Sequence, residues 1–259
     1  YQCVADILED ERLQKLARFT QHAGTSRLQQ CLNVSYYSFL MCKVLGWDYR
    51  SAARAGLLHD MYLYDWRRKR CPGLSNHATW HPRVALDNAR KNAARFGLAG
   101  RIGFVQCDGL AGVSPRAVDT VVCAGMGSDL ICRIIGDAPW LRDAGYTLIL
   151  QPQGTVHDLR RWLQANGFAI CRETLVQDGG FLYPVMAVRY GPGGAASPGA
   201  DYCSRALRES GSPLLGAYLA RQRRNLEKSV AGLQKARAEA DRQKLGYFAA
   251  ALAEITQME

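Results

Sequence analysis

Residues 118–151 read VDTVVCAGMGSDLICRIIGDAPWLRDAGYTLILQ, and this stretch decides the fold class. It opens with a β-rich apolar run at 118–124, continues with a helical pattern over 128–136, and ends with a second apolar run at 146–151. A strand, a helix and a strand in this order are the building unit of a largely parallel sheet. The stretch therefore predicts an α/β layer.

The same alternation continues on both sides of this stretch. Asp178-Gly179-Gly180 separates the last two apolar runs, and turn residues of this kind predict an antiparallel hairpin. The additional strands are expected over 102–106, 167–176 and 181–190, and the additional helices over 83–97 and 155–166.

Both ends of the chain have helical periodicity. Over residues 7–66 the apolar side chains recur at helical spacing, without the alternation of a strand. The composition of GPGGAASPGA (191–200) predicts a flexible linker before the tail. The tail fits either a helical hairpin that reverses near 236–243 or one bent helix. Its apolar residues spaced seven apart, as in a coiled coil, are Leu219, Leu226, Leu233 and Ala240.

The composition narrows the class of protein. The 259 residues carry 33 Lys and Arg against 23 Asp and Glu, a net charge of +10 that suits a polyanionic partner. No apolar run reaches the roughly 18 residues of a membrane span, so we expect no membrane partner. The nine cysteines form no CxxC pair, which indicates reduced thiols in a cytoplasmic protein rather than a zinc knuckle.

The first third of the chain holds four of the five histidines. His59 and Asp60 end an apolar helical run, and His77 and His81 would share one face of a helix. Imidazoles and a carboxylate together suit a divalent transition metal. The words LLHD, LYDW and HATWHPRVALDNA resemble the HD superfamily of metal-dependent phosphohydrolases over residues about 19–90.

That resemblance implies a helical bundle in which His59 and Asp60 are metal ligands, with a possible divalent metal between them. Gln30 stands where the family places its first histidine, and the later ligands of the family have no match. Because a neutral amide is a poor ligand for transition metals, we expect weak or no metal binding.

The last two thirds of the chain resemble a different family. The words VDTVVCAGMGSDLI, LILQPQGTVHDLRRWLQANGFAI and DGGFLYPVMAVRYG resemble the bacterial tRNA (adenine-N1)-methyltransferases over roughly 85–255. The resemblance implies transfer of a methyl group from S-adenosylmethionine to adenine N1 in tRNA. The expected fold is an incomplete Rossmann-like methyltransferase core, without its first two strands, between an HD-like helical segment and a helical, coiled-coil C-terminal hairpin.

The resemblance also implies the residues of the site. The cofactor would be bound by Asp108, Gly109, Leu110 and Ala124, and the reaction centre would be lined by Gly125, Met126, Gly127, Gln151 and Pro152. Small residues at the C-terminal edge of parallel strands allow a ligand to approach the backbone closely. Adenine N1 already carries a nucleophilic lone pair, so the reaction mainly needs alignment with the methyl group.

One family element has no counterpart here. The family begins its domain with a strand and a glycine-bearing cofactor loop, whereas VADILED (4–10) contains no glycine. We therefore expect impaired cofactor binding, and two alternatives remain: an HD-type phosphohydrolase and a non-catalytic RNA-binding remnant. The predicted domains are a helical segment at 1–84, a methyltransferase core at 85–192 and a helical domain at 201–259.

The tail carries a candidate RNA-binding surface. Arg221, Arg224 and Lys228 are three or four residues apart on a helix expected over 214–235, so they share one face. This basic stripe is either a solubilising surface or a contact for tRNA phosphates. We expect no DNA partner.

Overall fold

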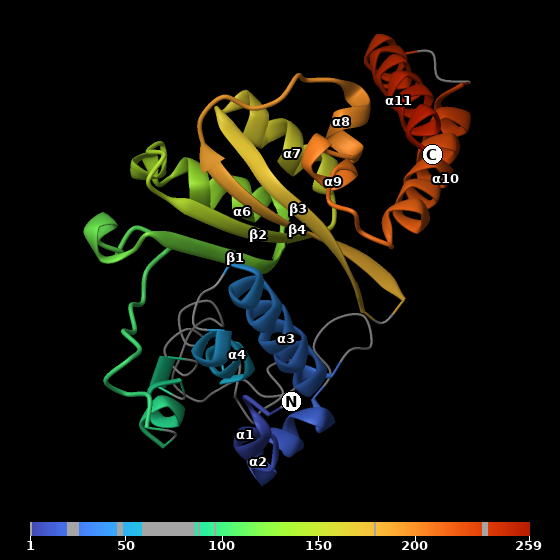
Figure 1. Cartoon of the computed structure of the whole chain (residues 1–259). Helices are drawn as coiled ribbons and strands as arrows, with labels where there is room; N and C mark the ends of the chain where they lie inside the picture. The colour runs from blue at the N-terminus through green and yellow to red at the C-terminus, as the bar shows by residue number, and fades with distance from the viewer. Residues whose placement is uncertain are drawn as a thin grey trace. The chain divides into compact units, whose positions relative to one another are not determined.

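The computed structural model, drawn in Figure 1, describes residues 2–19, 26–45, 49–58, 86–87, 89–95, 97–178, 180–234 and 238–259. Its internal contacts divide the chain into two units, Tyr1–Asp108 and Gly109–Glu259. Each unit has its own buried core. The domain boundaries expected from the sequence stay predictions.

Up to residue 95, the described residues of the first unit are mainly helical, as their periodicity predicts. Its core contains Ile7, Leu13, Leu16 and Leu57, none of which is exposed. The two longer helices approach closely, because a Cβ on Gly56 would lie 2.9 Å from the backbone of Ser35. The helices are α1 (Ala5–Leu8), α2 (Glu11–Lys15), η1 (Leu16–Arg18), α3 (Arg27–Leu45) and α4 (Tyr49–Leu58), and residues 89–95 are also helical.

The second unit is built on a four-stranded sheet in the order β1-β2-β4-β3. The apolar runs expected over 118–124 and 146–151 pair in parallel, with Thr120 opposite Thr147. The last two runs form the predicted antiparallel hairpin, with Phe168 opposite Tyr190. The strands are β1 (Thr120–Gly127), β2 (Thr147–Gln153), β3 (Phe168–Asp178) and β4 (Phe181–Tyr190).

Helices α6 (Ser128–Gly136) and α7 (Val156–Ala165) cover one face of this sheet (Figure 1). Their apolar stripes meet the inward-facing strand residues, which is why both amphipathic patterns predict the observed helices. The core they form is fully enclosed at Leu150, Leu159, Leu163, Met186 and Val188. Short 3₁₀ turns, η2 (Pro115–Ala117) and η3 (Pro139–Leu141), begin with proline.

The tail forms a helical hairpin rather than one bent helix. Helix α10 (Leu215–Leu233) packs against α11 (Glu239–Met258), and Figure 1 shows the two running side by side. Leu219 and Leu226 are buried in the seam and Leu233 is half-buried. Ala240 is exposed, because the chain has already reversed before it and the spacing of seven no longer continues along one helix.

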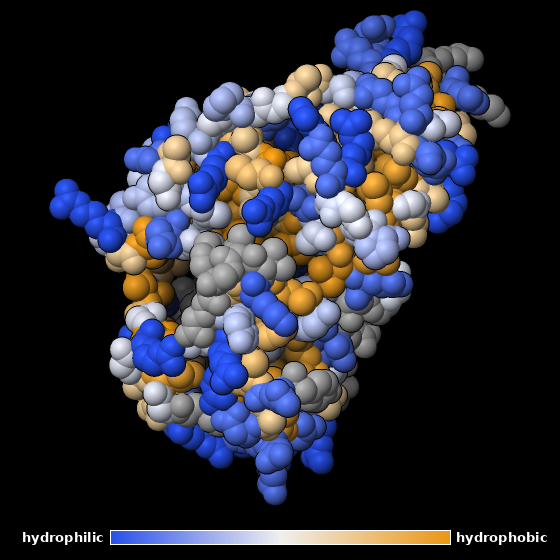
Figure 2. All heavy atoms as spheres, viewed as in Figure 1, coloured by the Kyte–Doolittle hydropathy of each residue, from blue (hydrophilic) through white to orange (hydrophobic). Residues whose placement is uncertain are grey.

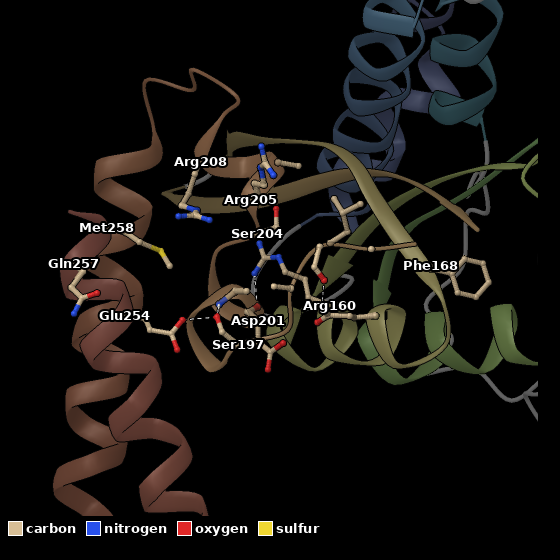
Figure 3. Close-up of a pocket in the computed structure, with 17 residues that line it drawn as sticks. Arg160, Phe168, Ser197, Asp201, Ser204, Arg205, Arg208, Glu254, Gln257 and Met258 are labelled. Atoms are coloured by element: carbon tan, nitrogen blue, oxygen red, sulfur yellow. Dashed lines mark hydrogen bonds between the residues drawn. The ribbon is translucent and has the colours of Figure 1, made fainter. Parts of the chain in front are cut away.

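The expected linker at 191–200 is only partly irregular. Helix α8 (Pro198–Tyr202) begins within it, and a short helix α9 (Arg205–Arg208) follows. Ser197 caps α8 and donates a 2.5 Å hydrogen bond to the Glu254 carboxylate of α11, shown in Figure 3. Gly199 is buried against Glu254, where an added Cβ would overlap the Glu254 Cβ. Glycine therefore provides close packing here and not flexibility.

The strand expected at 102–106 is wrong. These residues are irregular, and Val105 is 58% exposed. An apolar run forms a strand only where another strand accepts and donates its backbone hydrogen bonds, and none of the described residues pairs with it. Within the described ranges no strand precedes Thr120, so β1 has a single partner strand there and Val122 is 50% exposed.

In the part of the chain that the structure describes, no helix is both long and apolar enough to cross a membrane. Figure 2 shows hydrophilic side chains over the end of the α10–α11 hairpin.

Candidate active site

The end of β1 is the centre of the candidate site. Val121 and Cys123 point into the core, after which the strand bulges between Ala124 and Met126. Gly125 occupies the bulge with a φ of +74°, which is the left-handed region that favours glycine. An added Cβ at Gly125 or Gly127 would meet no atom within 4 Å. The backbone of this turn is therefore approachable by a ligand.

Gln151 joins the ends of the two parallel strands. Its side chain is 2% exposed, and its Oε1 accepts a 2.8 Å hydrogen bond from the backbone N–H of Gly125. Its Nε2 donates a 3.2 Å bond to the carbonyl of Pro152, which stands opposite Met126 in the register. The five residues expected to line the reaction centre thus lie together at the C-terminal edge of β1 and β2.

Helix α6 begins directly after this turn. Gly127 is its N-cap residue and offers no side chain to the free N–H groups of the first turn. The hydroxyl of Ser128 is buried and has no hydrogen-bond partner among the described residues. The helix start thus leaves polar groups available beside Gly125.

The expected cofactor residues are placed less tightly. Gly109 has a φ of +52°, and a Cβ there would lie 3.4 Å from Ile134 of α6. Leu110 packs on the core of the second unit. Asp108 is exposed and is the last residue of the first unit, whereas Ala124 lies in β1 and is half-buried.

A groove of about 500 Å³ begins at the end of β2 and continues between the β4 end of the hairpin and α10. We call it the β2–α10 groove. Its side chains come from the loop after β2, the start of α7, β4 and one face of α10. Its polar and aromatic lining includes Gln153, His157, Phe181, Tyr183, Arg221, Gln222 and Asn225, and Pro152 lies at its β2 end.

Arg160 lines the β2–α10 groove and belongs to a buried ion pair. Arg160 of α7 donates a 2.5 Å bond to the Glu173 carboxylate of β3, and it also bonds the carbonyls of Asp201 and Tyr202. Burial alone would lower the pKa of Arg160, but the facing Glu173 carboxylate and Tyr218 hydroxyl more than offset this and raise it. Arg160 is therefore a fixed cation that ties α7 to the chain around α8.

His157 stacks on Tyr202 at the start of α7, with ring centroids 4.6 Å apart and an angle of 8° between the planes. Burial lowers the pKa of His157, partly opposed by the nearby Asp158 carboxylate. Burial also raises the pKa of Tyr202 to about 12. Both rings are therefore neutral near pH 7.

The basic stripe on α10 is not uniform. Arg221 lies over the ring of Phe181, with its guanidinium carbon 5.5 Å from the ring centroid, and it is half-buried. Arg224 and Lys228 are exposed. The stripe therefore borders the β2–α10 groove at one of its three residues.

The expected metal ligands, His59 and Asp60, lie outside the described residues. Among those that the structure does describe, no three His, Cys, Asp or Glu side chains gather as a metal site would require. Gln30 lies in α3, and its side-chain oxygen is buried.

Phe181 and Tyr183, which line the β2–α10 groove, are not among the site residues expected from the sequence. Phe181 and Tyr183 follow the Gly180 turn on alternate positions of β4, so they share one face. An aromatic pair directly after a hairpin turn was the available signal, but the pattern FLYPVMAVRY does not say which face is buried.

The chain is similar in sequence to a described protein family and to a curated protein. Residues 83–254 match the family model for tRNA (adenine(22)-N(1))-methyltransferase. The tRNA (adenine(22)-N(1))-methyltransferase of Bacillus subtilis is 28% identical over 136 residues, 52% of this chain and 54% of the relative. The chain thus spans about half the length of this curated relative.

Solved structures share the fold. A Streptococcus pneumoniae protein put forward as a tRNA (m1A22) methyltransferase is 26% identical, with a TM-score of 0.55 over 68% of this chain and 77% of that chain. The same protein in complex with S-adenosyl-L-methionine gives a TM-score of 0.53 at 26% identity, over 67% and 76%. Since the family model matches more than half of the chain, this protein belongs to the tRNA (adenine(22)-N(1))-methyltransferase family.

Proposed function

We propose that this protein transfers a methyl group to N1 of an adenine in tRNA. The observation that carries the proposal is the edge of β1 and β2, where the bulged glycine turn is held by the buried Gln151 amide. This edge is where open α/β sheets bind their ligands. The family match over 83–254 supports methyl transfer as the reaction that we place at this edge.

The residues at this edge fit S-adenosylmethionine as cofactor. Gly125 and Gly127 present open backbone, and the hydroxyl of Ser128 is buried without a partner in the described chain. The N–H groups at the start of α6, which Gly127 leaves without a side-chain cap, can donate to the carboxylate of the cofactor's amino-acid part. We propose that Ala124 and the Asp108–Leu110 segment bind this cofactor, and that residues 125–127, 151 and 152 surround the reacting atoms.

When bound, the cofactor supplies an electrophilic methyl group on a sulfonium. The protein's residues need to hold the adenine in line with it, because N1 already carries the lone pair that forms the new bond. Pro152 and the bulged turn set the walls of that position, and Gln151 fixes the turn through Gly125. No general base is needed for the methyl transfer itself, so the absence of a charged side chain in 124–127 and 151–152 is compatible with the reaction.

The test is methyl transfer from labelled S-adenosylmethionine to tRNA, with mass analysis of the nucleosides. The expected product is 1-methyladenosine, and a tRNA with guanine at position 22 should lose it. Binding of S-adenosylmethionine is measured separately by calorimetry. A protein that neither binds the cofactor nor labels tRNA would overturn the proposal.

Two alternatives are less favoured. The comparisons do not support an HD-type phosphohydrolase, nor a divalent metal at His59 and Asp60. A non-catalytic RNA-binding protein would bind tRNA without binding S-adenosylmethionine, so the calorimetric arm separates it. We further propose the domain boundaries 1–84, 85–192 and 201–259, and a cytoplasmic location.

A further inference from the structure

The lining of the β2–α10 groove is suited to a polyanion. The groove is lined by two arginines, of which Arg160 is 3% exposed and paired with the buried Glu173, so Arg221 is the cation that the groove offers to a ligand. None of its lining residues in the described chain is Asp or Glu. A second cavity, of about 540 Å³, lies against α8 and α11, and its lining mixes Asp201 and Glu254 with Arg160, Arg205 and Arg208 (Figure 3). Glu254 binds Ser197 and the Gly199 N–H there, so that cavity is a seam between packed elements. The seam thus carries charges of both signs, whereas the β2–α10 groove offers a cation and has no carboxylate in its described lining.

Phe181 gives the β2–α10 groove an exposed aromatic wall. It is the first residue of β4 and is 54% exposed although it is large and apolar. Its ring lies 6.3 Å from that of Tyr183 and 5.5 Å from the guanidinium carbon of Arg221. An aromatic ring beside a cation is the arrangement that binds a nucleotide, since the ring stacks on the base and the cation meets the phosphate.

The β2–α10 groove also offers neutral hydrogen-bonding groups. Gln153 follows Pro152 on β2, and Gln222 and Asn225 come from the α10 face that also carries Arg221. Side-chain amides both donate and accept, so they can bond to base edges without adding charge. The two ends of the β2–α10 groove thus differ: Pro152 belongs to the proposed reaction centre, while Phe181 and Arg221 belong to the hairpin and α10.

We infer that the β2–α10 groove holds the nucleotide next to the target adenine, with its base stacked on Phe181 and its phosphate beside Arg221. The inference rests on the proposed function, because the target adenine must occupy the Pro152 end. Phe181 is thereby a positioning residue: it holds the RNA strand that carries the adenine and does not touch the reacting atoms.

The test uses tRNA with 2-aminopurine in place of the nucleotides that flank adenine 22, since stacking changes the fluorescence of this base. Wild-type protein and the variants F181A and F181W are titrated with this tRNA. Stacking on an aromatic side chain accounts for about a 5- to 150-fold change in affinity, so F181A should weaken binding within that range and lose the fluorescence change. F181W should keep both.

A matched pair on α10 separates stacking from charge. R221Q and R224Q each remove one positive charge from the same helix, but only Arg221 lies over Phe181. We expect R221Q to raise the KM for tRNA several-fold more than R224Q, with kcat and S-adenosylmethionine affinity little changed in both.

The outcomes distinguish the two proposals. If the wild type methylates tRNA and F181A has unchanged affinity and unchanged fluorescence, the groove inference is wrong and the proposed function stands. If the wild type binds no S-adenosylmethionine and leaves tRNA unmethylated, the proposed function fails first. Equal effects of R221Q and R224Q would mean that Arg221 contributes only its positive charge, and this result would contradict the inference.

Discussion

Gly125 and Gly127 are two residues apart and differ mainly in backbone conformation. An added Cβ would meet nothing within 4 Å at either position, but only Gly125 has a left-handed φ, of +74°. We expect Gly125→Ala to lower the free energy of unfolding by about 1–2 kcal/mol, the cost of placing an L-residue there. Gly127→Ala, at a φ of −64° that alanine adopts without strain, should cost about 0.5 kcal/mol, because alanine is a poorer N-cap residue than glycine. Urea unfolding of both variants is the measurement, and equal effects would contradict the assigned bulge.

A single histidine should make stability depend on pH. Burial lowers the pKa of His157 in the folded protein, while the unfolded chain keeps its ordinary value of 6.5. The unfolded state therefore binds the proton more tightly, so this contribution is fully present above about pH 6.5 and is lost as the pH falls below it. We expect urea midpoints at about pH 5 and pH 7.5 to differ less in His157→Gln than in the wild type. The same pH dependence in both proteins would exclude His157 as the cause.

At the level of single residues, the sequence predicts one half of the candidate site. Gly125 and Gln151 belong to two separate motifs, and the structure joins them by a hydrogen bond. Phe181 and Arg221 were not connected, because their contact depends on how α10 packs against the hairpin. Local patterns predict which residues border a strand, but contacts between distant elements are set by tertiary packing.

A strand expected from the sequence is present in the structure where a second strand pairs with it. The runs that became β1 to β4 each found a partner strand, whereas 102–106 has none among the described residues and is irregular. Helices α6, α7 and α10 follow their apolar periodicity. At Gly199 the composition is misleading. The glycine and proline content of 191–200 predicts a flexible linker, but the missing side chain of Gly199 allows α8 to pack against Glu254 of α11.

The packing of α7 depends on one buried charge. Arg160 is 3% exposed and Glu173, its partner on β3, is equally buried. Arg160→Met leaves the carboxylate without its cation, so we expect a loss of about 3–5 kcal/mol in the free energy of unfolding. Arg205→Met, which removes an exposed arginine paired with the exposed Glu209, should cost much less. Denaturant unfolding compares them, and adding Glu173→Leu to Arg160→Met should recover stability; no recovery would contradict a loss due to the orphaned charge.

Charge is a property of the whole molecule, because the +10 surplus is not confined to one segment. The affinity of any cationic surface for tRNA falls as the salt concentration rises. A plot of log affinity against log salt concentration has a slope of roughly 0.7–0.9 in magnitude per neutralised phosphate. If the basic stripe contacts tRNA, replacing Arg221, Arg224 and Lys228 together by Gln should flatten that slope by about two to three units.

The control for that prediction removes the same charge elsewhere. Arg116, Arg142 and Arg172 are exposed and come from separate parts of the second unit, so their triple Gln variant keeps the stripe intact. We expect this control to change the slope by less than about one unit, because positive charges that contact no phosphate are largely screened beyond about 10 Å at 0.1 M salt. The measurement is tRNA affinity across a salt series, with circular dichroism to verify folding. Equal slopes for the two triple variants would mean that the whole surface, and not the α10 face, attracts the RNA.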